Sequence, residues 1–356
     1  MGSSRPGSRR VALLVLAFAA VLLVARWSGS SSLRAPEAPP VAPVEIDGPP
    51  GTVLYLGGWE PASVELSSGL ARRLPAPFEG RAQLRRVGGV TIAITGGSAW
   101  VVPAAGSPPP RRLGMADGVL DSPAAGRVWL VEVDDASTYE LVEVGLADGR
   151  RLARQVLPAW APPYAVTKAG VLIRNLADGG LELRGPGRPT RRLSSDVDAA
   201  FVDASADTAA WIDTGGLHLY DLATGRDRVV RPPTVGATWL VYGPASRTYC
   251  CSVLGAFSPS GQTLAVFLTV NGLKEPGLAV VDAARATAAA IPGSHDAIPV
   301  SCQTCVSWSG RGDWLFYLGV WPWQISAFRL GSASASLLAV DLTVVVDSAP
   351  DGLAAG

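Results

Sequence analysis

The stretch Ala209–Val230 reads AAWIDTGGLHLYDLATGRDRVV. Two turn sequences, Gly215-Gly216 and Ala223–Arg226, separate three short runs that contain apolar residues, and in the middle run, Leu217–Leu222, these recur at nearly every second position. A period of two is typical of a strand with one buried face, and glycine-containing turns are typical of hairpins. We therefore expect three antiparallel strands joined in a meander.

The same hairpin pattern recurs along the chain. Taking one central residue from each copy, successive copies are 37, 41, 41, 36, 61 and 47 residues apart. Repeats of about 40 to 50 residues are typical of the four-stranded blades of a β-propeller. A single meander cannot exclude water, so we expect the copies to pack face to face in a ring. The seven equivalent residues are Val64, Val101, Val142, Leu183, Leu219, Val280 and Ala327.

A further strand precedes several of these hairpins, as in residues 120–130, 256–266 and 306–315. These segments resemble the F-S-P-D-G-x-x-L-A-F segment of WD-repeat and TolB-like propellers. The resemblance covers about residues 51–342 and implies an all-β propeller, in this chain with seven four-stranded blades. It implies no activity, because such propellers serve as scaffolds, peptide binders and enzyme domains. The tryptophans expected between neighbouring blades are Trp129, Trp211, Trp308 and Trp314.

The composition limits the classes of function. The 356 residues are 48% hydrophobic and 17% charged, which predicts a folded chain. Thirty Lys and Arg balance thirty Asp and Glu. The chain thus lacks the excess of positive charge that a nucleic-acid backbone requires, and we expect no nucleic-acid partner.

The N-terminus indicates export. Arg5, Arg9 and Arg10 precede an uncharged apolar run, Val11–Ala25. Basic residues before such a run retain the N-terminus in the cytoplasm. Since Arg26 and Trp27 spoil a cleavage site, we favour an uncleaved signal anchor over a cleaved signal peptide. The protein is then a single-pass protein of the cytoplasmic membrane with its C-terminal domain outside, or a secreted protein if the segment is cleaved.

The sequence therefore predicts one transmembrane helix followed by a linker and the propeller. The linker is rich in Pro and Ser and should be extended. We expect a basic cytoplasmic N-terminus (1–10), a membrane helix through which the protein contacts the membrane (11–26) and the linker (27–50). The propeller (51–348) and a flexible C-terminal tail (349–356) follow. The sequence does not identify the strand that closes the ring. The one candidate considered is Leu342–Val346, paired with the first blade.

The long 61-residue step places an insertion at about Arg231–Val253, and it contains two of the four cysteines, Cys250 and Cys251. The other two, Cys302 and Cys305, precede the first strand of the next blade. In an exported chain, disulfides that join the two pairs are favoured. A four-thiolate zinc site and a redox-active C-x-x-C pair are the alternatives, although adjacent cysteines suit zinc poorly.

Few other residues suggest chemistry. His218 lies in an alternating strand and is expected to be a half-buried strand residue, while His295, beside Asp296, is weighed as a base or metal ligand. No G-x-S-x-G nucleophile motif occurs. We therefore assign no catalytic, cofactor-binding or metal-binding residue.

Aromatic residues suggest a contact surface at one end of the propeller. They lie in the insertion and in a Trp-Pro-Trp hairpin, where proline prevents strand pairing. The leading hypothesis is a membrane-anchored, extracytoplasmic module that binds a protein, glycan or other ligand, and a non-enzyme is favoured over an enzyme. The alternatives are an extracytoplasmic hydrolase or lyase with a propeller-end site, and a structural spacer. The binding-surface residues are Trp239, Tyr242, Trp321 and Trp323.

Overall fold

The computed structural model divides the chain into two compact units, Met1–Pro43 and Val44–Gly356. The residues that it describes all belong to the second unit, and the expected membrane helix and linker lie outside them. No helix among the described residues is long and apolar enough to cross a bilayer. The described residues are 52–78, 80–103, 109–134, 138–240, 254–270, 275–294, 297, 305–319, 324–338 and 352–356.

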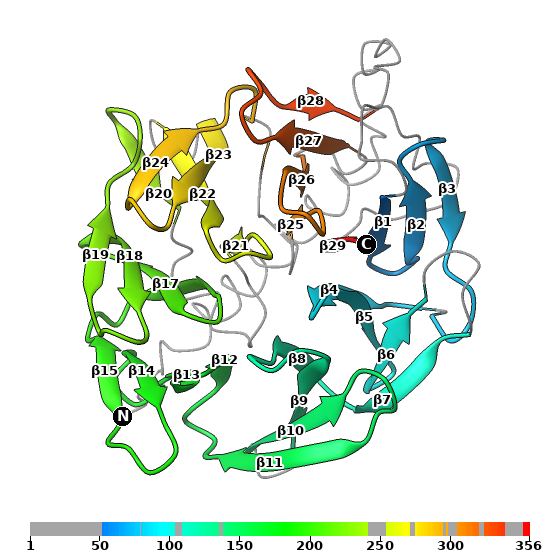
Figure 1. Cartoon of the computed structure of the whole chain (residues 1–356), viewed down its shortest axis with the longest axis horizontal. Coiled ribbons are helices and arrows are strands. Elements are labelled where there is room, and N and C mark those ends of the chain that lie inside the picture. The colour runs from blue at the N-terminus through cyan, green and yellow to red at the C-terminus, as the bar shows by residue number, and fades with distance from the viewer. Residues whose placement is uncertain are drawn as a thin grey trace, which may run out of the picture. The chain divides into compact units, whose positions relative to one another are not determined.

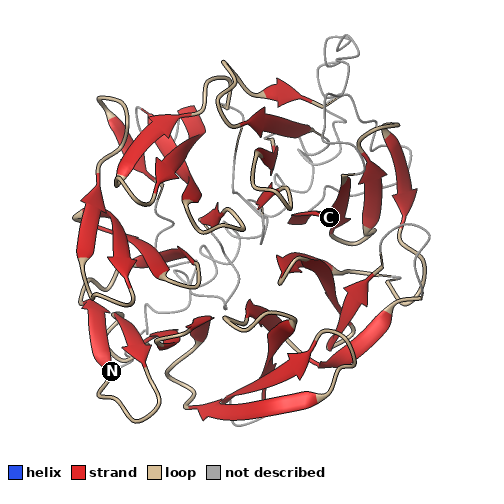
Figure 2. Ribbon diagram, in the orientation of Figure 1, coloured by secondary structure: helices blue, strands red, loops and turns tan. Residues whose placement is uncertain are grey.

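Seven antiparallel sheets form a ring and are numbered blades 1 to 7 (Figure 1). Strands and loops alone appear in the described part (Figure 2). The first strand of each blade contacts the first strand of the next blade all the way round. The predicted seven-bladed propeller is confirmed, and the seven equivalent residues each lie in the third strand of a different blade.

Blades 1 to 4 each contain four strands, which are named in order from the channel outward. Blade 1 is β29 (Gly352–Ala355), β1 (Val53–Gly57), β2 (Ala62–Glu65) and β3 (Leu70–Arg73); blade 2 is β4 (Gln83–Val87), β5 (Val90–Thr95), β6 (Ser98–Val102) and β7 (Arg111–Met115). Blade 3 is β8 (Gly118–Asp121), β9 (Arg127–Val133), β10 (Tyr139–Gly145) and β11 (Arg151–Leu157); blade 4 is β12 (Pro163–Thr167), β13 (Gly170–Arg174), β14 (Leu181–Arg184) and β15 (Arg191–Ser194).

Blades 5 and 7 repeat this plan, whereas blade 6 has its first strand in two pieces. Blade 5 is β16 (Ala200–Ala204), β17 (Thr208–Asp213), β18 (Gly216–Asp221) and β19 (Asp227–Val230); blade 7 is β25 (Val306–Trp308), β26 (Trp314–Leu318), β27 (Ile325–Arg329) and β28 (Ser336–Leu337). Blade 6 is β20 (Ala237–Trp239) with β21 (Gly255–Phe257), then β22 (Thr263–Val270), β23 (Glu275–Asp282) and β24 (Thr287–Ala290).

The C-terminus closes the ring. Strand β29 pairs antiparallel with β1, so blade 1 combines one strand from the end of the chain with three from its beginning. The expectation of a flexible tail at 349–356 is therefore wrong for Gly352–Ala355. Residues 342–346, the closing strand considered from the sequence, lie outside the described residues.

The insertion interrupts the first strand of blade 6. Both β20 and β21 pair with the same edge of β22. Leu240 donates its backbone N–H to the Phe267 carbonyl at 3.1 Å, and the Phe267 N–H donates to the Leu254 carbonyl at 3.1 Å. The chain thus leaves the strand at Leu240 and re-enters it at Leu254, so residues 231–240 belong to the blade rather than to the insertion.

Apolar clusters fill every interface between neighbouring blades. Seven clusters of described residues join blades 1–2, 2–3, 3–4, 4–5, 5–6, 6–7 and 7–1. Trp211 and Trp308 are fully buried there, whereas Trp129 and Trp314 are half-buried at the edges of their clusters. Because each blade has a neighbour on both faces, no blade leaves an apolar face in water.

Arginines at the starts of outer strands connect blades at the rim. Arg111 of β7 donates to the Leu146 and Ala147 carbonyls of blade 3. Arg228 of β19 makes the equivalent contact with the Ala283 and Ala284 carbonyls of blade 6, at 2.7 and 2.5 Å. The recurrence of arginine at this point of the repeat therefore has a structural cause.

Candidate functional site

A cavity of about 740 Å³ occupies the channel side of the propeller, and each of the seven blades contributes a first-strand residue to its wall. It extends to the end where first strands turn into second strands, since those turns also line it. Its volume is in the range of small-molecule sites. The first-strand residues include Leu353, Arg85, Arg86, Asp121, Val166, Asp203, Phe257 and Trp308.

Two aspartates place carboxylates in this cavity. Asp121 ends β8 and accepts the Gly88 N–H at 3.1 Å, while Asp203 of β16 accepts the Phe257 N–H at 2.7 Å. Enclosure by protein raises the pKa of Asp203 to about 6, against the opposing effects of the Arg85 charge and of backbone N–H donors. Enclosure likewise raises the pKa of Asp121, again opposed by Arg85.

The Asp121 carboxylate contacts water in the channel, but it is surrounded by protein on most sides. Its side chain counts as exposed because it faces the open space of the channel. Protein nevertheless surrounds that space, so the carboxylate has much less bulk water around it than a group on the outer surface. We therefore treat it as accessible to a ligand but incompletely hydrated.

Two consecutive arginines supply positive charge. Arg85 donates from Nη1 to the Val119 carbonyl of blade 3 at 3.0 Å, and Arg86 donates to the Ala355 carbonyl of blade 1. Burial lowers the pKa of Arg86, and the neighbouring Tyr55 hydroxyl partly opposes this shift. A guanidinium remains protonated under such conditions.

These four charges have an unusual arrangement. Their hydrogen bonds connect them to backbone groups of neighbouring blades, and within the described part of the chain none of them forms an ion pair. Charges removed from bulk water are usually paired. The cavity is therefore a polar site fixed by the backbone, with charge of both signs still available to a ligand.

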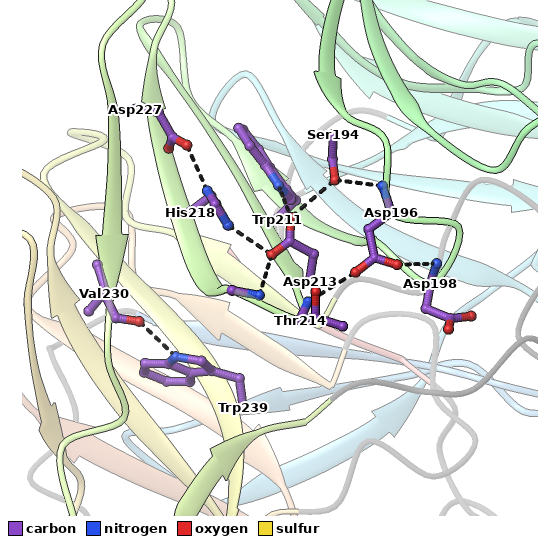
Figure 3. Close-up of polar contacts among 11 residues, drawn as sticks. Ser194, Asp196, Asp198, Trp211, Asp213, Thr214, His218, Asp227, Val230 and Trp239 are labelled. Atoms are coloured by element: carbon purple, nitrogen blue, oxygen red, sulfur yellow. Dashed lines mark hydrogen bonds and ion pairs between the residues drawn. The ribbon is translucent and has the colours of Figure 1, made fainter.

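Trp239, predicted on a binding surface, is instead part of the core. It is 6% exposed, and its indole Nε1 donates to the Val230 carbonyl at 3.0 Å (Figure 3). The prediction is wrong because Trp239 belongs to β20 and packs between blades 5 and 6. The other three aromatic residues of that surface, Tyr242, Trp321 and Trp323, lie outside the described residues.

Of the four cysteines, Cys305 alone is described. It is 1% exposed, packs between blades 6 and 7, and is not a free thiol. Cys250, Cys251 and Cys302 lie outside the described residues, as do His295 and Asp296. The pairing of the cysteines remains a prediction. Among the described residues, no group of three or more His, Cys, Asp or Glu side chains is placed to hold a metal ion.

His218 is half-buried in a strand, as expected, but it also belongs to a polar cluster. Its Nδ1 lies 2.7 Å from Asp227 Oδ2 and its Nε2 lies 2.8 Å from Asp213 Oδ1 (Figure 3). The ring stacks on Trp211 at 4.9 Å between centroids, and Ser194 donates to the other oxygen of Asp213 at 3.0 Å. Ser194 is directed at a carboxylate and not at the imidazole, so the cluster is not a nucleophile activated by a base.

The channel charges are not predicted by the sequence patterns. Asp121 and Asp203 each stand near the end of a short apolar run, VLD and FVDA, where a solvated turn is the simpler interpretation. A usable signal is their common position, since both end a first strand, one in blade 3 and the other in blade 5. Arg85 and Arg86 resemble the other Arg pairs of the chain, but they lie in a first strand rather than an outer one.

Known structures share this fold. A puromycin-hydrolyzing peptidase from Mycobacterium tuberculosis matches with a TM-score of 0.55 and 16% identity over 84% of this chain, which spans 53% of the peptidase. A functionally unknown protein from Desulfotomaculum acetoxidans matches with a TM-score of 0.51 and 8% identity, over 85% of this chain and 98% of that one. TolB from Acinetobacter baumannii matches with a TM-score of 0.48 and 12% identity, over 83% of this chain and 78% of TolB.

No protein-family model and no curated protein matches the sequence. These structural matches are below 25% identity, so they show a common fold and transfer no activity. The expected resemblance to TolB-like and WD-repeat propellers holds at the level of the fold, because the sheets of this chain form a seven-bladed β-propeller.

Proposed function

We propose that the propeller is a recognition module that binds a small ligand in its channel. One observation carries the proposal: a cavity of about 740 Å³, lined by all seven blades, has four charged side chains on its first strands, and none of these four has an ion-pair partner among the described residues. Enclosed charges destabilise a fold unless something compensates them. A ligand that supplies the missing partners accounts for their presence.

A binding screen tests this proposal. The purified full chain is screened by thermal shift against a broad library of charged and neutral metabolites, in parallel with Asp203→Asn and Arg86→Gln. We expect at least one compound to raise the melting temperature of the native protein and to lose that effect in a variant. Asp198→Asn and Arg150→Gln are matched controls, because both residues are exposed and lie outside the cavity lining. If every stabilising compound acts equally on all five proteins, the channel is not the binding site.

We further propose that residues 11–26 anchor the propeller outside the cytoplasmic membrane. The support is the sequence: basic residues precede an apolar run, and a Pro-rich linker follows it. A disulfide at Cys305, which is not a free thiol, suits an oxidising compartment. Protease treatment of intact cells tests the topology: digestion of the propeller from outside is expected, and full protection would contradict it. A non-reducing peptide map identifies the partner of Cys305.

A second candidate is a hydrolase or lyase acting in the channel. It is favoured by Asp203, whose raised pKa of about 6 suits proton transfer near neutral pH, and by the second carboxylate of Asp121 in the same cavity. Turnover of a bound compound, abolished by Asp203→Asn while binding persists, would support this candidate over a binding module. A partner at the Trp321 and Trp323 hairpin remains a separate prediction from the sequence.

A further inference from the structure

The charges in the channel are divided between two sides of the ring. Arg86 binds the Ala355 carbonyl of blade 1, and a Cβ added at Gly310 of blade 7 would lie 3.0 Å from its Nη2. Its guanidinium is therefore located beside blades 7 and 1. Asp203 belongs to blade 5, which stands across a seven-membered ring from blade 1, and Asp121 belongs to blade 3.

Arg85 does not cancel the difference in charge between the two sides of the ring. It lies near enough to both carboxylates to lower the pKa of each, so it offsets part of their negative charge. Among the first-strand side chains, one arginine against two carboxylates leaves a net charge of −1 on that side when both are ionised. The other two charged residues of the lining belong to other parts of blade 5: Asp207 pairs with Lys168, and Arg228 donates to two carbonyls of blade 6. Arg86 leaves a charge of +1 on the other side, where its neighbours are the Ala355 carbonyl and the Tyr55 phenol.

We propose that the channel cavity binds a small zwitterion, whose ammonium-type group lies at Asp121 and Asp203 and whose carboxylate-type group lies at Arg86. The inference rests on the proposed channel-binding function and specifies its ligand class. Guanidinium groups bind carboxylates through two parallel hydrogen bonds, and an ammonium group donates to several carboxylate oxygens at once.

Other ligand classes fit the cavity less well. A simple anion would compensate Arg86 but would leave the aspartate side with its net negative charge, and a simple cation would compensate the aspartate side but leave Arg86 without a partner. A metal ion bound by protein alone would require more ligating side chains than two carboxylates, and the described residues offer no such group. A cavity of about 740 Å³ lined by seven blades also has the size of a small-solute site rather than of an extended polymer groove.

The backbone prepares the site for such a ligand. Asp121 is held by the Gly88 N–H, Asp203 by the Phe257 N–H and Arg86 by the Ala355 carbonyl, so each charged group is already oriented before binding. Fixed groups lose less conformational entropy on binding than mobile surface side chains do. Phe257, which is half-buried, also lines the cavity, and it offers apolar contact to the chain between the two charges.

A series of ω-amino acids tests the inference by titration calorimetry on the full chain. Glycine, 4-aminobutanoate and 6-aminohexanoate separate an ammonium group from a carboxylate by increasing distances. Butylamine and butanoate each carry one of these charges. We expect one member of the series to bind at least tenfold more tightly than either single-charge compound.

Variants assign the two ends. Arg86→Gln should reduce the affinity of that amino acid to about that of butylamine, and Asp203→Asn should reduce it to about that of butanoate. Arg86→Lys should restore part of the affinity, which guards against loss through misfolding, and Arg150→Gln and Asp198→Asn should bind normally.

The outcomes separate the two proposals. If an amine or a carboxylate alone binds as tightly as the amino acids and requires Asp203 or Arg86, the channel site stands and the zwitterion is wrong. The same holds if no ω-amino acid binds while a library compound does so in a channel-dependent way. If no compound depends on the channel residues, the proposed function fails, and the ligand class fails with it.

Discussion

Two groups of charged side chains in this propeller differ in how their charges are compensated. In the blade 5 cluster, defined as Ser194, Trp211, Asp213, His218 and Asp227, the imidazole lies between two carboxylates and on an indole face. In the channel, Arg85, Arg86, Asp121 and Asp203 are bonded to backbone groups and, among the described residues, to no opposite charge within ion-pair distance. The carboxylates of the first group have a side-chain partner within the protein, whereas we propose that a ligand supplies the partners of the second group.

Removing the imidazole should have the largest effect on stability. The imidazole of His218 lies within hydrogen-bond distance of two carboxylates, with Nε2 beside Asp213 and Nδ1 beside Asp227. The side chains of His218 and Asp213 are 13% and 12% exposed. We expect His218→Ala to lower the free energy of unfolding by about 3 kcal/mol, since it leaves a half-buried carboxylate without its partner. Urea unfolding monitored by tryptophan fluorescence measures this; a loss below about 1 kcal/mol would show that the cluster is not structural.

Replacing a carboxylate of the channel should stabilise the protein, which is the opposite of the effect expected at His218. Folding raises the pKa of Asp203 from 3.8 to about 6, so the folded protein retains a proton on this group that the unfolded chain has released between those values. The contribution of Asp203 to stability is therefore greatest below pH 4 and is lost as the pH rises through 6. Two pKa units correspond to about 3 kcal/mol, and water in the channel reduces this to about 2 kcal/mol.

Asp203→Asn imitates the protonated carboxyl group at every pH. We expect the variant to match the native protein at pH 4 and to exceed its stability by about 2 kcal/mol at pH 8, as measured by thermal melting across that range. A residue whose replacement stabilises the fold but abolishes binding is a residue retained for function. Equal stability of the two proteins at pH 8 would show that the ionised Asp203 carboxylate does not destabilise the fold. It would contradict the difference drawn between the channel and the blade 5 cluster.

Much of the fold could be predicted because its signals are local. Alternating residues and glycine turns, as in Ala209–Val230, define hairpins without reference to the rest of the chain, and their spacing gives the blade count. The closing strand Gly352–Ala355 has the sequence GLAA, which carries no strand pattern of its own. Its conformation results from pairing with β1, almost the whole propeller sequence away.

The site could not be predicted for a related reason. Trp239 falls within the expected insertion because an interrupted strand looks like a long loop, and strand β20 is three residues long. Asp121 belongs to a segment that the pattern indicates, whereas the strand that contains Asp203 has no predicted counterpart, and the ring decides which end of a strand faces a channel. Spacing identifies the repeat, whereas the positions of charges in the channel depend on all seven blades at once.

The rim arginines provide an intermediate case. Arg228 reaches two carbonyls of blade 6, as Arg86 reaches one of blade 1, but Arg228 is a half-buried residue of the outermost strand of its blade, where it lines the cavity from outside the first strands. We expect Arg228→Met to lower the free energy of unfolding by about 1 kcal/mol, since hydrogen bonds are lost without leaving a charge unpaired. Urea unfolding should show this loss at both pH 4 and pH 8. A pH-dependent effect would instead indicate that the rim charges are coupled to titrating groups.

The smallest effect should come from an ion pair that is fully accessible to water. Lys168 and Asp207 lie 3.0 Å apart across blades 4 and 5, with side chains 61% and 73% exposed. Water screens both charges, so Lys168→Ala should change the free energy of unfolding by less than about 0.5 kcal/mol. Unfolding of this variant in low and high salt checks the result. A loss as large as that of His218→Ala would mean that exposure does not separate structural from functional charges in this protein, because a hydrated pair would then stabilise it as much as an enclosed one.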